Sequence, residues 1–168
     1  MEGPIVIPAR EKIKTLEEIK ADCEKLKQQG KTIVFTNGCF DILHPGHTRY
    51  LEQARSLGDY LIVAVNSDGS IRKIKGPGRP IMPESARAEV LAALQFVDAV
   101  VIFEEPDPYC IIKELVPHVL VKGGDWAEDE IIGSDIVKTG GGRVVRIPYI
   151  EGLSTTAIIE RIAKSFRN

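Results

Sequence analysis

Residues 33–47, IVFTNGCFDILHPGH, constrain the fold more than any other part of this 168-residue sequence. They open with a short apolar run that is typical of a strand buried on both faces. Asn37-Gly38 then breaks the strand, and Pro45-Gly46 stands where a helix would begin. A strand, a glycine-containing loop and a helix N-terminus favour phosphate binding, because the first helical N–H groups lack internal partners and the helix dipole attracts negative charge.

Two histidines, His44 and His47, enter the same turn and point the same way if the turn is helical. They are consistent with turn residues that have no role, or with metal ligands. A closed zinc site wants four ligands, however, and Cys39 is the only nearby soft donor. The third interpretation is donation of hydrogen bonds to phosphate oxygens as charge builds in a transition state. We favour it, because only three histidines occur in the chain and two of them fall at this switch from strand to helix.

Strand-like and helix-like patterns alternate along the rest of the chain. Further strands are expected at residues 60–65, 98–103, 118–122 and 143–148. Helices are expected at residues 15–30, 84–96, 108–115, 128–138 and 157–166, with Thr15 and Ser154 as N-caps. The alternation predicts an α/β protein with a Rossmann-like five-stranded parallel sheet, helices on both faces and right-handed crossovers.

Four segments with binding potential follow predicted strands, at the edge where open α/β sheets bind ligands. After residues 33–35 comes the motif already described. Residues 71–83 are expected to form a loop, either an ordinary solvated one or one whose cations, such as Lys75, close over a triphosphate. Gly123-Gly124-Asp125-Trp126 follows the fourth strand. Ser154-Thr155-Thr156 opens the last helix, where the hydroxyl groups cap the helix and also suit a second phosphate cradle.

Arg87 lies near the start of a predicted helix, where its positive charge opposes the helix dipole. Such a cation indicates either an anionic ligand or an ordinary surface pair with Glu84. His118 precedes its strand, at the end opposite the site, and we interpret it as structural.

The sequence GCFDILHPGH at residues 38–47 resembles the signature of the nucleotidyltransferase superfamily with the His-x-Gly-His motif, the cytidylyltransferase-like group. Further matches at residues 65–68 (VNSD), 75–80 (KGPGRP), 120–126 (LVKGGDW) and 151–156 (EGLSTT) resemble its heptose 1-phosphate adenylyltransferase branch. Cys39, where most of the superfamily has threonine, agrees with that branch. In that branch the domain occurs alone or fused behind a sugar kinase, and the length of this chain favours the stand-alone form.

The resemblance implies transfer of AMP from ATP to D-glycero-β-D-manno-heptose 1-phosphate, giving ADP-heptose and pyrophosphate for the lipopolysaccharide core. ATP is thus the expected nucleotide, with Mg²⁺ held mostly by phosphates and water rather than by protein ligands. The implied catalytic residues are His44, His47, Lys75 and Arg87. The implied nucleotide-binding residues are Cys39, Phe40, Gly46, Gly124, Asp125, Trp126, Gly152, Ser154, Thr155 and Thr156.

Three other functions stay open: a cytidylyltransferase for a small polyol phosphate, an FAD-synthetase-like adenylyltransferase, and a nucleotide-binding domain without turnover. Glycerol 3-phosphate cytidylyltransferases carry Arg-Thr before Glu-Gly at the last motif, whereas this chain has Tyr149-Ile150 there. That difference weakens the cytidylyltransferase interpretation. The full set of histidine, lysine, arginine and hydroxyl positions argues against a domain that only binds.

Composition limits the remaining possibilities. The net charge of −2 and the pI near 6.0 do not favour nucleic acid as a partner. No membrane-spanning run or signal peptide is evident, and three cysteines fit a reducing compartment, so we expect a cytoplasmic enzyme of small-molecule substrates. We expect residues 1–30 to form an arm and a helix packed on a nucleotidyltransferase domain at residues 31–168. A homo-oligomer is also expected, with the N-terminal helix as part of its interface.

Overall fold

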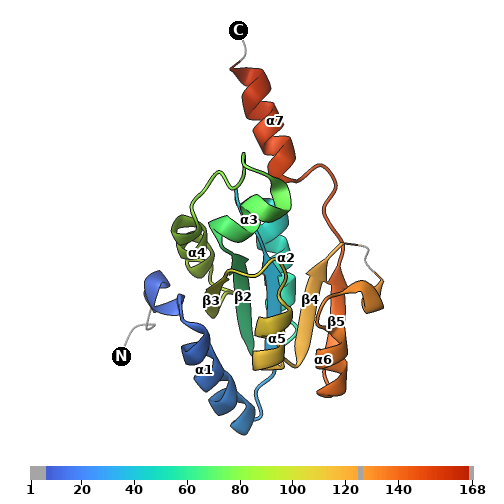
Figure 1. The fold of residues 1–168 in the computed structure, drawn as a ribbon. Helices are drawn as coiled ribbons and strands as arrows, with labels where there is room; N and C mark the ends of the chain where they lie inside the picture. Colours follow the sequence, from blue (N-terminus) through green and yellow to red (C-terminus); the bar gives the residue numbers. More distant parts are fainter. Residues whose placement is uncertain (1–6, 125–126, 167–168) are drawn as a thin grey trace.

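The computed structural model describes residues 7–124 and 127–166, and it contains a five-stranded sheet in the order β3-β2-β1-β4-β5 (Figure 1). All neighbouring strands are parallel. The strands are β1 (Ile33–Gly38), β2 (Tyr60–Asn66), β3 (Ala99–Phe103), β4 (Val119–Gly123) and β5 (Arg143–Ile147). The predicted fold class is therefore confirmed, and β1 lies at its centre because both flanking strands pair with it.

Helices cover both faces of the sheet, as the buried apolar runs of the strands require. On one face, side chains of α1 (Leu16–Gln28), α5 (Tyr109–Leu115) and α6 (Ser134–Thr139) form a core with alternate residues of the strands. On the other, α2 (Pro45–Arg55) and α4 (Glu84–Ala92) pack on the remaining strand residues. Two short 3₁₀ segments, η1 (Ala9–Lys12) and η2 (Glu128–Glu130), lie before α1 and before α6.

Residues 7–30 pack against the domain rather than extending from it. The Lys14 amide donates to the carbonyl of Val100 on β3 (2.9 Å), and Ile19 and Cys23 of α1 are buried. Thr15 caps α1 in a capping box with Glu18, as its sequence predicts. The division of the chain at residue 30 stays a prediction.

The prediction of a loop at residues 71–83 is wrong for residues 71–75. Residues Asp68–Lys75 form helix α3, whose N-cap Ser67 accepts a hydrogen bond from the Ser70 amide. Gly76 ends the helix with a positive φ of 90°, a conformation that glycine adopts without strain. Lys75 therefore lies in the last turn, where a cation suits the helix dipole.

Other boundaries shift less. The predicted helix at residues 84–96 ends at Ala92, and the one at residues 128–138 is divided into η2 and α6 by Gly133, which has a positive φ of 86°. His118 is structural as predicted, because its Nδ1 accepts a hydrogen bond from the Ile33 amide at the start of β1 (2.9 Å).

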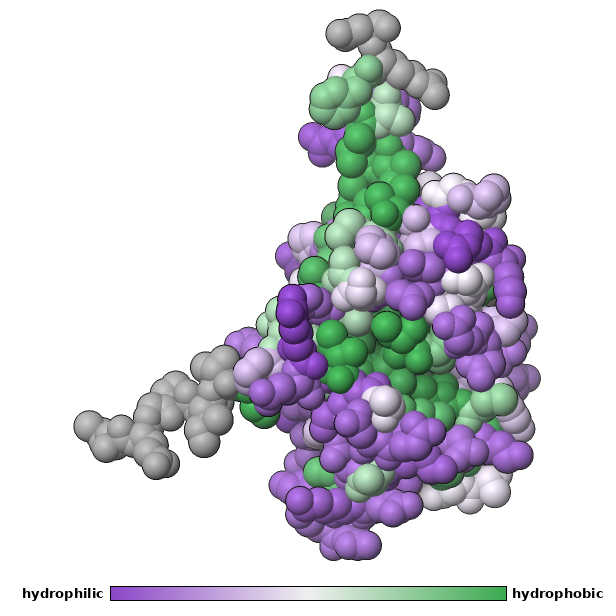
Figure 2. Space-filling model, turned by 60° about the vertical axis from the view of Figure 1, so that its left-hand side comes forward, coloured by the Kyte–Doolittle hydropathy of each residue, from purple (hydrophilic) through white to green (hydrophobic). Residues whose placement is uncertain are grey.

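The last helix, α7 (Thr155–Ser165), stands away from the sheet (Figure 1). None of its residues is buried, and Ile162 is 51% exposed. Figure 2 shows the resulting apolar strip along this protruding helix. Within the part of the chain that the structure describes, no helix is long and apolar enough to cross a membrane.

Candidate active site

The carboxyl ends of the central strands open into a cavity of about 500 Å³. It lies between the loop after β1, the start of α2, the end of α3, the end of β4 and the segment between β5 and α7. Most of the predicted site residues line it. They are Cys39, Phe40, His44, Gly46, His47, Lys75, Ser154, Thr155 and Thr156.

His44 is the N-cap of α2, and its hydrogen bonding fixes its tautomer. Its Nδ1 accepts a hydrogen bond from the Gly46 amide at 3.1 Å, so the neutral ring carries its proton on Nε2. Burial lowers the pKa of His44, which keeps the ring neutral at pH 7. The Nε2–H group is thus available to a ligand in the cavity.

His47 stacks on His44, with ring centroids 3.9 Å apart and an interplanar angle of 30°. On its other side the Phe40 ring lies 5.4 Å away, and Phe40 itself has a positive φ of 45° that is unusual for a non-glycine residue. Burial, together with His44 and Lys75, lowers the pKa of His47 to about 4. The two rings are therefore neutral hydrogen-bond donors rather than cations at neutral pH.

One polar atom of His47 is unsatisfied. Its Nδ1 is buried and has no hydrogen-bond partner among the described residues. An unpaired buried polar group costs about 1–3 kcal/mol, so its ring position is maintained by the packing of Phe40 and His44 rather than by hydrogen bonds. The histidine pair is therefore held in place before any ligand binds.

Asp41 ties the loop after α3 to the motif. Its fully buried carboxylate accepts hydrogen bonds from the amides of Ile81 (2.9 Å) and Met82 (2.8 Å) and from Nε of Arg79 (2.6 Å). Burial raises the pKa of Asp41, but these donors outweigh burial and hold it below its usual range. Arg79 also lines the cavity; it belongs to the segment whose cations were expected to close over a triphosphate, although it is not among the predicted site residues.

Arg87 does not line the cavity, contrary to the predicted contact with the ligand. Its side chain is fully buried and donates to the carbonyls of Cys39 (2.6 Å) and Met82 (3.0 Å) and to the carboxylate of Asp68 (2.8 Å). The alternative pair with Glu84 does not form either: among the described residues Arg87 pairs with Asp68, and Glu84 accepts a hydrogen bond from the Asp68 amide. Arg87 thus joins the motif loop, the loop after α3 and the start of α3, which carries Lys75, and acts as a positioning residue.

The N-terminus of α7 forms a second side of the cavity. Ser154 caps the helix by accepting a hydrogen bond from the Ala157 amide (3.0 Å), as predicted. Thr155 donates to the carbonyl of Ile42 at 3.4 Å and so joins α7 to the motif loop. Two helix N-termini, of α2 and α7, meet at one cavity, and this arrangement favours an anion with several phosphate groups.

Lys122, the fourth residue of β4, is a cavity residue that sequence reasoning missed. Its Nζ lies 3.3 Å from the side-chain oxygen of Asn37 at the end of β1. The sequence signals were its place at the end of an apolar strand, just before Gly123-Gly124, and its place in the match at residues 120–126. Tyr149 also lines the cavity, and its ring covers Gly123 so closely that a Cβ there would lie 2.8 Å from Cε1.

The remaining predicted residues have other positions. Gly124 and Gly152 do not line the cavity, although the Gly124 amide donates to the carbonyl of Ile147 (3.0 Å) and so holds the loop after β4. Asp125 and Trp126 lie outside the described residues.

The donor set does not suit a metal ion. Among residues 7–124 and 127–166, no three histidine, cysteine or acidic side chains group as metal ligands. Asp41 is the carboxylate in the cavity, but both of its oxygens already accept hydrogen bonds from the protein. The described residues therefore do not form a protein site for Mg²⁺.

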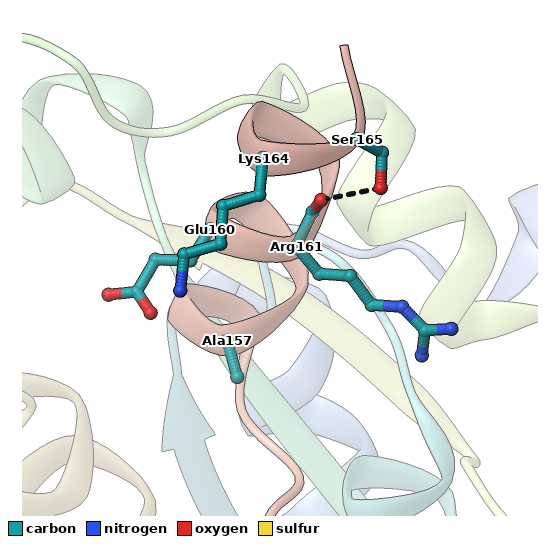
Figure 3. Close-up of a pocket in the computed structure, with 5 residues that line it drawn as sticks. All are labelled: Ala157, Glu160, Arg161, Lys164 and Ser165. Atoms are coloured by element: carbon teal, nitrogen blue, oxygen red, sulfur yellow. Dashed lines mark hydrogen bonds between the residues drawn. The ribbon is translucent and has the colours of Figure 1, made fainter. Parts of the chain in front are cut away.

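A second hollow lies along α7 (Figure 3). It is lined by Ala157, Glu160, Arg161, Lys164 and Ser165. In Figure 3 these side chains project from a single helix, and the Ser165 hydroxyl donates to the Arg161 carbonyl at 2.9 Å. This hollow is open surface, and the cavity at the carboxyl ends of the strands is the candidate active site.

A parallel α/β sheet with a His-x-Gly-His turn at its ligand-binding edge is the arrangement expected of the nucleotidyltransferase superfamily. The family model described as "Cytidylyltransferase-like" matches residues 35–161. This chain belongs to the cytidylyltransferase-like family.

The chain is also similar in sequence to curated proteins. A protein named "Bifunctional protein HldE" from a Nitratiruptor species is 55% identical over 155 residues, which are 92% of this chain and 33% of that protein. The protein of the same name from Syntrophotalea carbinolica is 51% identical over 151 residues, 90% of this chain and 31% of the relative. The chain thus spans about a third of the length of these relatives.

Solved structures match the fold. The "lipopolysaccharide core biosynthesis protein" from Thermoplasma volcanium is 34% identical and superposes with a TM-score of 0.63, over 73% of this chain and 100% of that one. A pantoate-beta-alanine ligase from Francisella tularensis superposes with a TM-score of 0.58 over 93% of this chain and 79% of that chain. At 16% identity the second structure shows a shared fold only.

Proposed function

We propose that this chain transfers AMP from ATP to D-glycero-β-D-manno-heptose 1-phosphate, giving ADP-heptose and pyrophosphate. The observation that carries the proposal is the neutral, stacked pair of His44 and His47 at the N-terminus of α2, facing a cavity lined by Lys75. This arrangement suits the triphosphate of a nucleotide. The relatives named HldE and the lipopolysaccharide core biosynthesis protein support the choice of nucleotide and acceptor.

The chemistry needs no protein nucleophile. An oxygen of the acceptor phosphate forms a bond to the α-phosphorus of ATP, the bond from that phosphorus to the bridging oxygen breaks, and pyrophosphate leaves with the electron pair. Catalysis then consists of positioning and charge stabilisation. His44 donates its Nε2–H to phosphate oxygens, and His47 donates from the adjacent ring.

Cations and helix N-termini stabilise the leaving group. Lys75 and Arg79 line the cavity beside the histidines, and their charges offset the charge that develops on pyrophosphate. The first amides of α7 and the hydroxyl of Thr156 bind the remaining phosphate oxygens. Cys39 and Phe40 lie along the nucleotide through backbone contacts. Mg²⁺ held by the ATP phosphates and water would supply further charge neutralisation, and no described residue is assigned to it.

The chain is also proposed to form a homo-oligomer in the cytoplasm. The expected role of the N-terminal helix in the interface stays a prediction; Ile19 and Cys23 of α1 pack on the sheet of the same chain. The exposed apolar strip on α7 supports association through α7 (Figure 2). Sedimentation equilibrium of the wild type and of Ile162→Glu tests this, and an Ile162→Glu protein with the wild-type mass contradicts association through α7.

Pyrophosphate release in the presence of Mg²⁺ tests the reaction. ATP, CTP and GTP are each supplied with heptose 1-phosphate, glycerol 3-phosphate or FMN. We expect release with ATP and heptose 1-phosphate only. Release with CTP and glycerol 3-phosphate, or with ATP and FMN, identifies one of the two alternative enzymes, and nucleotide binding without release under any pairing indicates a domain that only binds.

A further inference from the structure

Lys122 is a cation that no carboxylate of residues 7–124 or 127–166 neutralises. Among the ion pairs of the described residues, none includes Lys122, and its recorded partner is the amide oxygen of Asn37 at 3.3 Å. The side chain is half-buried, and burial lowers the pKa of its ammonium group. Shielded charges in proteins are normally paired, so a lysine like this in a cavity favours an anionic ligand that supplies the missing charge.

The alternation of side chains along the strands shows from which side Lys122 reaches the cavity. Phe35 of β1 and Leu120 of β4 belong to the core under α1, α5 and α6. Asn37 and Lys122 follow them by two residues, so they lie on that same face of the sheet. The histidines come from α2, which packs on the opposite face. Lys122 and the histidine pair therefore approach one cavity from opposite sides of the sheet edge.

The two sides of the cavity correspond to the attacking group and the leaving group of the proposed reaction. In an in-line displacement the attacking oxygen and the leaving group lie on opposite sides of the phosphorus. The site at α2 and Lys75 takes the triphosphate and the leaving pyrophosphate, so the attacking group comes from the side of β4. The attacking group is itself a phosphate, so its negative charge needs a cation other than those that bind the pyrophosphate.

We propose that Lys122, oriented by Asn37, binds the phosphate of the acceptor and determines that the acceptor is a phosphorylated compound. The inference rests on the proposed function for the identity of the sugar, but not for the binding of phosphate. Lys122→Met is the main variant, because it keeps most of the side-chain length and removes the charge. Lys122→Arg restores a cation. Lys113→Met is the matched control, because Lys113 of α5 has the same side chain and charge and is exposed outside the cavity lining.

Steady-state kinetics separate acceptor binding from nucleotide binding. Lys122→Met is expected to raise the KM for the sugar phosphate by about 10- to 100-fold, with the KM for ATP changed less than about threefold. Lys122→Arg recovers part of the loss, and Lys113→Met leaves both values unchanged. An unchanged acceptor KM in Lys122→Met, or an equal rise in the KM for ATP, overturns the proposal.

A binding measurement keeps the test valid if heptose 1-phosphate is not the acceptor. Inorganic phosphate is titrated calorimetrically into protein saturated with an ATP analogue whose α–β bridge is methylene, with unfolding curves checking that each variant is folded. Phosphate binding by the wild type and its loss in Lys122→Met support the role of Lys122 even if the sugar is wrong. No phosphate binding by the wild type, or equal binding by both proteins, overturns it.

Discussion

Replacing Arg87 by methionine distinguishes a positioning residue from one that contacts the substrate. The change removes a fully buried guanidinium that satisfies two carbonyls and the Asp68 carboxylate. Loss of one partner of a buried pair costs about 3–5 kcal/mol, because the remaining charge and carbonyls stay buried without partners. We therefore expect Arg87→Met to lower the free energy of unfolding by about 3–5 kcal/mol.

Urea unfolding followed by circular dichroism measures this change, with Lys75→Met as the control. Lys75 lines the cavity and is not among the ion pairs of the described residues, so its loss leaves stability within about 0.5 kcal/mol while reducing turnover. If Arg87→Met does not fold at all, Arg87→Lys keeps the charge but not the fork of donors, and it is expected to lose about 1–3 kcal/mol. An Arg87→Met protein with wild-type stability and the kinetic defect of Lys75→Met refutes the reasoning and restores the direct contact with pyrophosphate.

Three further predictions follow from the same cavity. Because the pKa of His47 falls from 6.5 to about 4 on folding, the unfolded chain takes up the proton first, and stability decreases as the pH falls from about 6.5 to about 4, by up to about 3 kcal/mol. Unfolding curves measured over this pH range are expected to show a smaller loss of stability in His47→Gln than in the wild type. Identical pH profiles for the two proteins contradict the prediction. Gly46→Ala would bring a Cβ to 2.9 Å from Nδ1 of His44, so we expect a loss of kcat of about 10- to 100-fold, smaller than the roughly 10²–10³-fold for removing a donor outright, with far-UV circular dichroism unchanged. Asp41→Asn leaves donors of Arg79, Ile81 and Met82 without a charged acceptor, and we expect faster proteolysis of the loop after α3 and a higher KM for ATP, whereas wild-type proteolysis argues against that anchor.

Local patterns predicted the sheet and the position of the site because they depend on neighbouring residues. Apolar runs identified the strands, Thr15 and Ser154 identified helix starts, and the motif identified the loop from which His44 and His47 enter the cavity. Helix α3 was missed because its cations and the glycines and prolines that follow resemble a solvated loop. Its start at Ser67 and its end at Gly76 are still typical capping residues.

The roles of Arg87 and Lys122 depend on contacts between distant parts of the chain. Arg87 bonds to Asp68, 19 residues away, and to Cys39, 48 residues away, and its charge near a helix start gave no indication of those acceptors. Lys122 and Asn37 are 85 residues apart and meet because β1 and β4 are neighbours in the sheet. Strand order is a tertiary property, so a residue pattern along the chain does not specify which strand ends share a cavity.

The destination of the α-phosphorus of ATP tests the central claim most directly. Wild-type protein is supplied with heptose 1-phosphate and with ATP labelled with ³²P in the α or in the γ position, and the products are separated by chromatography. The account predicts that α label appears in the sugar nucleotide and γ label in pyrophosphate. It also predicts that His47→Ala, still folded, forms the labelled sugar nucleotide on the order of 10²–10³-fold more slowly. Transfer of γ label to the sugar, or an undiminished rate in His47→Ala, contradicts it.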